Sequence, residues 1–118
     1  VTTVRVPTYV GHGESVWIET KKPITPEAAR AVFAAAPGVR VVDEASPLEG
    51  VNCPMPLLAE GKDDSLVGRI RRDLFSDHAL AFWVVGDNLR KGAALNAVQI
   101  AETLAARGWL KPSVPAGR

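Results

Sequence analysis

The segment from Leu80 to Val85 constrains the fold more than any other part of the sequence. It is an almost unbroken run of apolar residues, with turn-forming residues at Ser76-Asp77 before it and at Gly86-Asp87-Asn88 after it. A short apolar run without polar alternation is typical of a β-strand that is buried on both faces. We therefore predict a buried strand here, around which the other elements are arranged.

Four other segments have the composition or the alternation of strands. Residues 2–10 are rich in β-branched and aromatic types, and Pro7 indicates an edge or a bend within them. Residues 14–21 are predicted as a second strand or as a bent continuation of the first. Residues 39–43 and 65–73 are predicted as further strands, the last with one charged face.

Two segments have the boundaries of helices. Thr25-Pro26-Glu27 supplies an N-cap, a proline at the first helical position and an acid in the first turn, and Pro37-Gly38 ends this helix. Residues 91–107 carry apolar side chains at helical spacing and end at Gly108. The proline-rich stretch 44–64 is expected to be a long ordered loop. This order of elements predicts an α+β fold, a mixed β-sheet with helices on one face.

Charge and cysteine content exclude several classes of protein. The net charge of +1 gives no reason to expect nucleic acid or an anionic membrane as partner. No apolar run is long enough to cross a bilayer, and no metal-ligand spacing occurs. The single cysteine, Cys53, cannot form an internal disulfide, which fits a reducing, cytoplasmic compartment. The chain begins at Val1 and its only methionine is Met55, so a fragment of a longer protein stays open.

His12 lies between two glycines after the first predicted strand. It is either a turn histidine without a chemical task or a general acid or base, because imidazole titrates near neutrality. The flanking glycines would let backbone or ligand approach closely. The local sequence leaves both interpretations open.

Arg5 is a candidate for holding a small acidic substrate, because a guanidinium binds a carboxylate through two parallel hydrogen bonds. It lies seven residues before His12. In one straight strand an odd spacing puts the two side chains on opposite faces, roughly 23 Å apart. They can serve one pocket only if the chain bends between them, at Pro7 or at Gly11.

Three other features carry weaker hypotheses. Arg69, Arg71 and Arg72 form a basic cluster, either a phosphate site or the solvated face of a strand that pairs with nearby acids. Cys53 has no neighbouring base or helix N-terminus to activate it, so we interpret it as a packing or surface thiol. The helix opening at Asn88 is expected to present a free N-terminus, which can receive a phosphate or a polar ligand edge.

Three stretches together resemble bacterial aspartate-semialdehyde dehydrogenases in residues, order and spacing. They are Arg5-Val6-Pro7 leading to Val10-Gly11-His12-Gly13-Glu14-Ser15, then Val67-Gly68-Arg69-Ile70-Arg71-Arg72-Asp73, and then Asp87-Asn88-Leu89-Arg90-Lys91-Gly92-Ala93-Ala94-Leu95-Asn96-Ala97-Val98-Gln99-Ile100-Ala101-Glu102. The last of them is long and specific, and the likeness extends over nearly the whole chain.

The resemblance implies an NADP-dependent enzyme that interconverts aspartyl phosphate and aspartate semialdehyde, on the route to lysine, threonine and methionine. In such enzymes a cysteine forms a thioester with the substrate, a histidine moves the proton and an arginine holds the α-carboxylate. The histidine and the arginine match His12 and Arg5. An asparagine that contacts the nicotinamide end of NADP matches Asn96.

The resemblance also implies how the chain is divided. Residues 1–86 would be the C-terminal part of a substrate-binding and dimerisation domain of the glyceraldehyde-3-phosphate-dehydrogenase-like superfamily. Its sheet around residues 67–85 would pair subunits into a homodimer or homotetramer. Residues 87–118 would be a C-terminal helix that packs on a nucleotide-binding domain absent from this chain. Without that partner, we expect the helix not to pack on its own sheet.

Three departures from the family pattern bear on activity. Gly13 stands where relatives often have serine. The Asn-Cys-Ser/Thr motif of the nucleophile has no counterpart, because Asn52-Cys53-Pro54 falls where relatives carry a proline-rich loop. A Gly-x-Gly-x-x-Gly turn for a dinucleotide is also missing. We therefore expect the chain alone to be inactive. A non-catalytic dimerisation module and a related acyl-phosphate reductase of the same superfamily stay open as alternatives.

Overall fold

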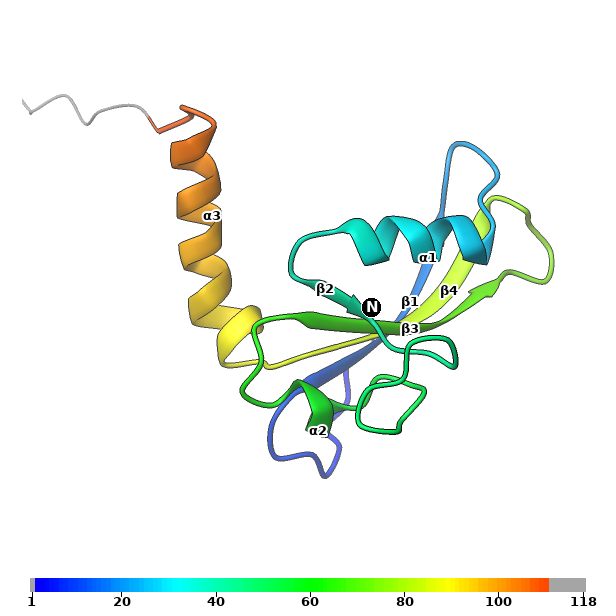
Figure 1. Cartoon of the computed structure of the whole chain (residues 1–118), viewed down its shortest axis with the longest axis horizontal. Coiled ribbons are helices and arrows are strands. Elements are labelled where there is room, and N and C mark those ends of the chain that lie inside the picture. The colour runs from blue at the N-terminus through cyan, green and yellow to red at the C-terminus, as the bar shows by residue number, and fades with distance from the viewer. Residues whose placement is uncertain (1, 111–118) are drawn as a thin grey trace, which may run out of the picture.

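The computed structural model describes residues 2–110 and contains one mixed four-stranded sheet (Figure 1). In chain order its elements are β1 (His12–Glu19), α1 (Pro26–Ala35), β2 (Val39–Val41), α2 (Pro56–Ala59), β3 (Ser65–Arg72), β4 (Ala79–Gly86), the π-helical turn η1 (Arg90–Ala94) and α3 (Leu95–Ala106). The predicted α+β fold with a mixed sheet is confirmed.

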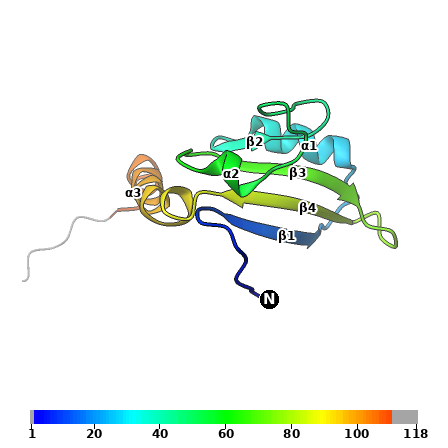
Figure 2. The same ribbon diagram turned by 90° about the horizontal axis from the view of Figure 1, so that it is seen from below.

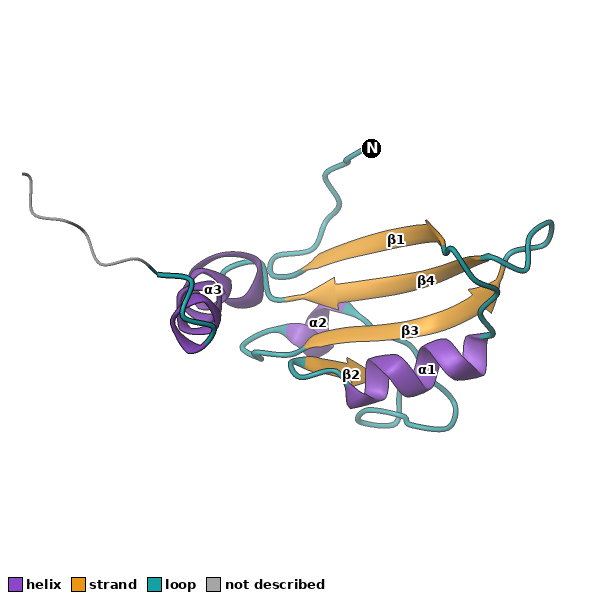
Figure 3. Cartoon of the chain, turned by 90° about the horizontal axis from the view of Figure 1, so that it is seen from above, coloured by secondary structure: helices purple, strands orange, loops and turns teal. Residues whose placement is uncertain are grey.

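The apolar strand β4 lies inside the sheet, whose order is β1-β4-β3-β2 (Figure 3). β4 pairs antiparallel with both β1 and β3, and β2 adds to β3 in parallel. In the β1–β4 register His12 is opposite Gly86 and Glu19 is opposite Ala79. The two ends of β1 are therefore fixed against the two ends of the most apolar strand.

Separate apolar clusters cover the two faces of the sheet. On the α1 face, Leu80 and Phe82 of β4 are buried together with Ala29, and the ring of Phe33 meets that of Phe82 edge-on at 5.2 Å. On the opposite face, Val85 is buried with residues of β3, α2 and the loop before α2. This explains the unbroken apolar character of β4, because each of its faces packs against protein.

The helix boundaries that the sequence predicts for α1 are confirmed. The Thr25 hydroxyl accepts a hydrogen bond from the N–H of Ala28 at 3.2 Å, as an N-cap does. After the helix, Gly38 has a φ of +72°, a conformation that residues with a Cβ rarely adopt. The chain then enters β2 directly.

The stretch 44–64 is an ordered connection, as predicted, but it also contains a covering element. Leu48, Leu58 and Ala59 are buried against the sheet, the last two within α2. A long helix therefore covers one face, whereas a loop with a single helical turn covers part of the other (Figures 1 and 3).

The prediction of a strand over residues 2–10 is wrong. These residues belong to no strand, and β1 begins only at His12. Val4, Val6 and Tyr9 are 77%, 62% and 105% exposed. Strand propensity depends on neighbours that bury the side chains, and no strand lies beside this segment in the part of the chain that the structure describes. Figure 2 shows the segment leaving the sheet beyond β1.

The long C-terminal helix forms but stands apart from the sheet. The predicted span 91–107 corresponds to η1 followed by α3, and Gly108 ends the helix with a φ of +65°. α3 has no buried residue, and it extends beyond the ends of the strands (Figures 1 and 2). This agrees with the expectation that it does not pack on its own sheet. Its packing on another domain stays a prediction, and residues 111–118 of that expected unit lie outside the described residues.

No helix within residues 2–110 is both long enough and apolar enough to span a membrane.

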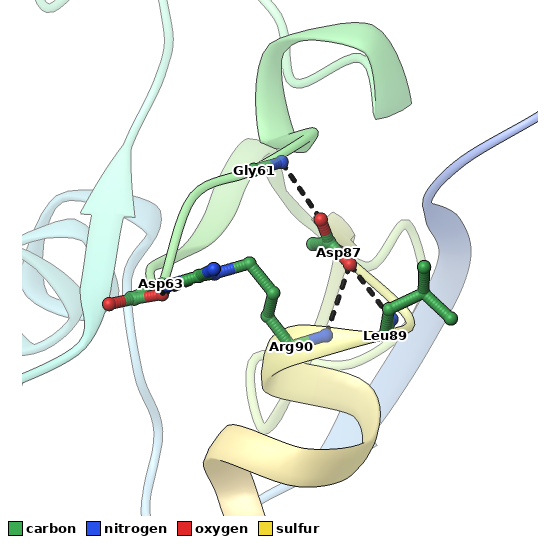
Figure 4. A network of polar contacts seen from close by, with 5 residues as sticks. All are labelled: Gly61, Asp63, Asp87, Leu89 and Arg90. Carbon is green, nitrogen blue, oxygen red and sulfur yellow. Dashed lines mark hydrogen bonds and ion pairs between the residues drawn. The ribbon is translucent and has the colours of Figure 1, made fainter.

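Asp87 joins the sheet to the helical segment (Figure 4). It is 3% exposed, and its carboxylate accepts hydrogen bonds from the N–H groups of Gly61, Leu89 and Arg90 at 2.8, 2.8 and 3.1 Å. The guanidinium of Arg90 in turn contacts Asp63 at 2.6 Å. One buried carboxylate therefore holds the loop before β3 and the first turn of the helix in a fixed relation.

We predict that Asp87 makes the stability of the fold change with pH in the acidic range. The N–H of Gly61 above all, with those of Leu89 and Arg90, lowers the pKa of Asp87 below its usual 3.8, although burial opposes this. A carboxyl whose folded pKa is lowered stabilises the fold above its usual pKa, and this contribution is lost as the pH falls through the lowered value. Asp87→Asn should lower the Tm by several degrees at pH 7 and by less at about pH 2, below the usual pKa.

Thermal unfolding at both pH values measures this difference. Asp64→Asn is the matched control, since Asp64 is exposed and makes no hydrogen bond or ion pair within residues 2–110. An Asp87→Asn variant as stable as the control at pH 7 would contradict the assignment.

Candidate active site

His12 is the first residue of β1 and its side chain is exposed. Within residues 2–110 the imidazole makes no hydrogen bond and no ion pair. Its backbone is held against β4 through the pairing of His12 with Gly86. The imidazole thus projects from a fixed strand end without being engaged in the core.

The turn before His12 is fixed from two sides. Gly11 has a φ of +96°, and its N–H donates to the Oδ1 of Asn88 at 2.7 Å. A Cβ at Gly11 would come within 2.9 Å of the Cβ of Pro56 at the start of α2. The predicted close approach at this glycine is therefore confirmed, and the approaching group is protein backbone and proline ring.

Gly13, on the other side of His12, lies under an indole. A Cβ at Gly13 would come within 2.4 Å of Cζ2 of Trp83, a residue of the neighbouring strand β4. The indole occupies the volume that a side chain at position 13 would need. The packing of Trp83 therefore explains why a residue without a side chain occupies position 13.

Arg5 lies in the exposed N-terminal segment, outside the sheet. Its guanidinium has no hydrogen-bond or ion-pair partner in the described part of the chain. The straight strand that would hold Arg5 and His12 on opposite faces does not form, because the chain turns near Pro7, where the N–H of Thr8 donates to the carbonyl of Val6 at 2.8 Å, and again at Gly11. The predicted bend is present, and a shared pocket stays a prediction.

Asn96 lies in the first turn of α3 and is half-buried. It lines an open groove between α3 and the turn that follows α1, together with Pro37, Gly38, Lys91, Gln99, Ile100, Glu102, Thr103 and Leu104. The Nζ of Lys91 donates to the Oε1 of Gln99 at 2.6 Å within this groove. The amide of Asn96 makes no hydrogen bond to any described residue, so its donor and acceptor are available to a ligand.

The three predicted site residues thus come from three separate segments. The β1–β4 register puts His12 beside Gly86, immediately before the segment that leads into η1 and Asn96. Arg5 is not brought against either of them by any contact within the described residues. The structure therefore brings His12 close to the junction between β4 and η1. Arg5 lies on the exposed N-terminal segment instead.

The expected free helix N-terminus after Asn88 is wrong. The carboxylate of Asp87 already accepts from the N–H groups of Leu89 and Arg90, and its main-chain carbonyl accepts from Gly92 at 2.9 Å. A helix start whose donors are satisfied by the protein has little left for an anion.

Two of the three clustered arginines and Cys53 line a second, open cavity of mixed charge. Arg72 pairs with Asp77 at 3.0 Å, as the solvated interpretation predicts. Arg69 and Arg71 line the cavity with Asp43, Glu44 and the half-buried Cys53. No group of three or more metal-ligating side chains occurs among the residues that the structure describes.

Two residues beside His12 were not identified from the sequence. Asn88 and Trp83 reach Gly11 and Gly13 from β4 or the residues that follow it, more than 65 positions away in the chain. Only the pairing of β1 with β4 reveals these contacts. The glycines on both sides of His12 were the available signal, because each indicates that something packs closely against it.

We predict that Gly13→Ser destabilises the chain by about 1–3 kcal/mol, because the indole of Trp83 has to move to admit a Cβ. The loss should be smaller in a Trp83→Leu background, since the shorter side chain leaves room. Chemical denaturation of the two single variants and the double variant measures this coupling. Equal effects of Gly13→Ser in both backgrounds would show that the indole is not the obstacle.

Comparison with known proteins agrees with the motifs. The sequence model of the family described as "Semialdehyde dehydrogenase, dimerisation domain" matches residues 1–91. The aspartate-semialdehyde dehydrogenase of Aquifex aeolicus is 53% identical over 109 residues, covering 92% of this chain and 31% of that protein. The one from Legionella pneumophila is 51% identical over 115 residues, covering 97% and 32%. The chain therefore spans about a third of the length of these relatives.

Solved structures give the same result. The crystal structure of aspartate semialdehyde dehydrogenase II from Vibrio cholerae complexed with ASA superposes with a TM-score of 0.74 at 42% identity. The likeness covers 86% of this chain and 29% of that one. Because the family model matches well over half of the sequence, the chain belongs to the semialdehyde dehydrogenase family and contains its dimerisation domain.

Proposed function

We propose that this chain is the substrate-binding and dimerisation portion of an NADP-dependent aspartate-semialdehyde dehydrogenase. The proposed reaction interconverts aspartyl phosphate and aspartate semialdehyde, on the route to lysine, threonine and methionine. The observation that carries the proposal is the exposed imidazole of His12 on a turn that Asn88 and Pro56 hold in place. Relatives named aspartate-semialdehyde dehydrogenase, about half identical over most of the chain, supply the substrate class.

In this proposal His12 is the general acid and base. A nucleophilic thiol contributed by protein outside this chain would give its proton to the imidazole as it attacks the carbonyl carbon of aspartyl phosphate, and cleavage of the bond to the phosphate would leave a thioester. The same imidazole would return the proton later in the cycle. Its exposure supports this role, because a group that exchanges protons with a substrate has to be reachable.

Arg5 is proposed to hold the α-carboxylate of the substrate through two parallel hydrogen bonds. Its guanidinium lacks a carboxylate partner within residues 2–110, so the charge is available for a ligand. The turns near Pro7 and at Gly11 break the straight path between Arg5 and His12, so strand alternation does not keep the two side chains on opposite faces.

NADP would accept or donate the hydride when bound. Asn96 fits the carboxamide of a nicotinamide, because its own amide is half-buried in an open groove without a hydrogen bond to the described residues. The residues for the pyrophosphate are not in this chain, which has no Gly-x-Gly-x-x-Gly turn. In this proposal the 118 residues alone lack the cysteine that attacks the substrate and most of the NADP site.

A chimeric enzyme tests the catalytic roles. We predict that residues 1–118, placed in the Aquifex aeolicus enzyme instead of its matching third, support phosphate-dependent oxidation of aspartate semialdehyde by NADP. His12→Ala should lower kcat by about 10²–10⁴-fold. Arg5→Leu should raise KM by about tenfold or more, as expected for loss of a charged hydrogen bond.

Arg40→Leu is the matched control for Arg5→Leu, since Arg40 is an exposed arginine of β2. It should leave both constants within about twofold. The 118-residue chain alone should show no NADP reduction. Turnover by the isolated chain, or a fully active His12→Ala chimera, would contradict the proposed roles.

We also propose that the sheet pairs two copies of the chain, as the description of the family domain indicates. Trp17, Ala81 and Arg71 lie opposite one another across β1, β4 and β3 on the face away from α1. Trp17 is 57% exposed there, although its Nε1 donates to Asp73 at 2.9 Å. Tryptophan is among the residues enriched in protein–protein interfaces, which supports this face as the contact.

We predict that the 118-residue chain sediments as a dimer and that Trp17→Glu shifts it to monomer, with Kd raised by at least about thirtyfold. Val32→Glu is the control, because Val32 is 65% exposed on α1, on the other face. Sedimentation velocity over a concentration series measures both. If Val32→Glu dissociates the dimer and Trp17→Glu does not, the interface lies on the α1 side.

A further inference from the structure

We propose that Asn88 is a positioning residue for His12, acting through the backbone of Gly11. The proposal rests on the proposed function, in which His12 is the acid and base. It adds a residue from a different part of the chain that determines where the imidazole lies.

The hydrogen bond that carries the proposal spans 77 positions in the sequence. The N–H of Gly11, the residue before His12, donates to Oδ1 of Asn88 at 2.7 Å in a partly buried environment. Gly11 has a φ of +96°, which is outside the range that β-strands use. The hydrogen bond therefore holds the peptide unit between Val10 and Gly11, which directly precedes the unit that leads into His12.

A second contact limits the same turn from the opposite side. Gly11 has no Cβ, and a Cβ there would come within 2.9 Å of the Cβ of Pro56. Pro56 is the first residue of α2, whose Leu58 and Ala59 are buried. Gly11 thus lies between Asn88, which accepts its hydrogen bond, and Pro56, which begins a helix with buried residues.

Asn88 is itself held firmly. It follows the buried Asp87, whose carboxylate accepts three backbone N–H groups and so fixes the junction between β4 and η1 (Figure 4). Its side chain is half-buried, and its acceptor oxygen is directed to Gly11. Asn88 can therefore transmit the position of this junction to His12, and the same junction leads into the helix that carries Asn96.

The geometry predicts that Asn88 affects kcat through the position of His12, in addition to any effect on the stability of the fold. Loss of the acceptor would free the Val10–Gly11 peptide unit, so that only the pairing with Gly86 would hold the backbone of His12 and the imidazole could move from its place. Small displacements of a proton-transfer group lower kcat strongly. Arg5 lies six residues before Gly11, on the far side of the turn near Pro7, so we expect KM to change less than kcat.

The test uses the chimera with the Aquifex aeolicus enzyme and a matched pair of substitutions. Asn88→Leu keeps the branching of the side chain and removes the acceptor, whereas Asn88→Asp keeps an acceptor oxygen in place. We expect Asn88→Leu to lower kcat by about ten- to a hundredfold with KM within about threefold. Asn88→Asp should keep kcat within about fivefold of the parent. Asn52→Leu, at an exposed asparagine in the loop before α2, is the control and should change neither constant.

A double-variant cycle separates positioning from stability. If Asn88 acts through His12, adding Asn88→Leu to His12→Ala should lower kcat by less than about twofold further. A further loss as large as in the parent would overturn the proposal, because it would show an effect independent of the imidazole. If His12→Ala lowers kcat and Asn88→Leu does not, the proposed function stands and this inference is wrong. A fully active His12→Ala chimera would instead overturn the proposed function.

Should the Asn88→Leu chimera fail to fold, Asn88→Ser replaces it in the same cycle, since its shorter side chain does not reach Gly11. The amide of Gly11 provides a readout besides activity. In the 118-residue chain its proton resonance should move upfield in Asn88→Leu or Asn88→Ser and stay near its original position in Asn88→Asp. An unchanged Gly11 resonance in all variants would contradict the hydrogen bond on which the proposal depends.

Discussion

The burial of β4 on both faces is the constraint on which the rest of the structure depends. A strand without polar alternation has to be covered twice, and the chain does so with α1 on one face and with α2 and its preceding loop on the other. The pairing of β4 with β1 and β3 then fixes what lies at the strand ends. His12 lies at one of these ends because its partner Gly86 is the last residue of β4.

The residues that follow β4 connect the strand end at His12 to the other elements of the candidate site. Asp87 satisfies backbone donors of the loop before β3 and of the first helical turn, and Asn88 reaches the turn before His12. One dipeptide thus connects the sheet, the helix that carries Asn96 and the turn that presents the imidazole. This explains why the start of the helical segment is held in place although α3 has no buried residue.

The sequence predicted the strands and helices whose burial or capping is local. The apolar run of β4, the Thr25 cap and the helix end at Gly108 each depend on residues close in the chain. The strand expected over residues 2–10 failed because strand propensity acts only where a neighbouring strand is available. Asn88 and Trp83 were not predicted as neighbours of His12, since their contacts arise from pairing between strands far apart in sequence.

In the proposed function Arg5 and His12 act on one substrate molecule. A crystal structure of the chimeric enzyme with a substrate analogue bound tests this most directly. We expect the guanidinium of Arg5 about 3 Å from the analogue's carboxylate and the imidazole of His12 within hydrogen-bond reach of the thiol or the reacting carbonyl. An Arg5 side chain that points away from the ligand, with His12 more than about 10 Å from the reacting carbon, would contradict it.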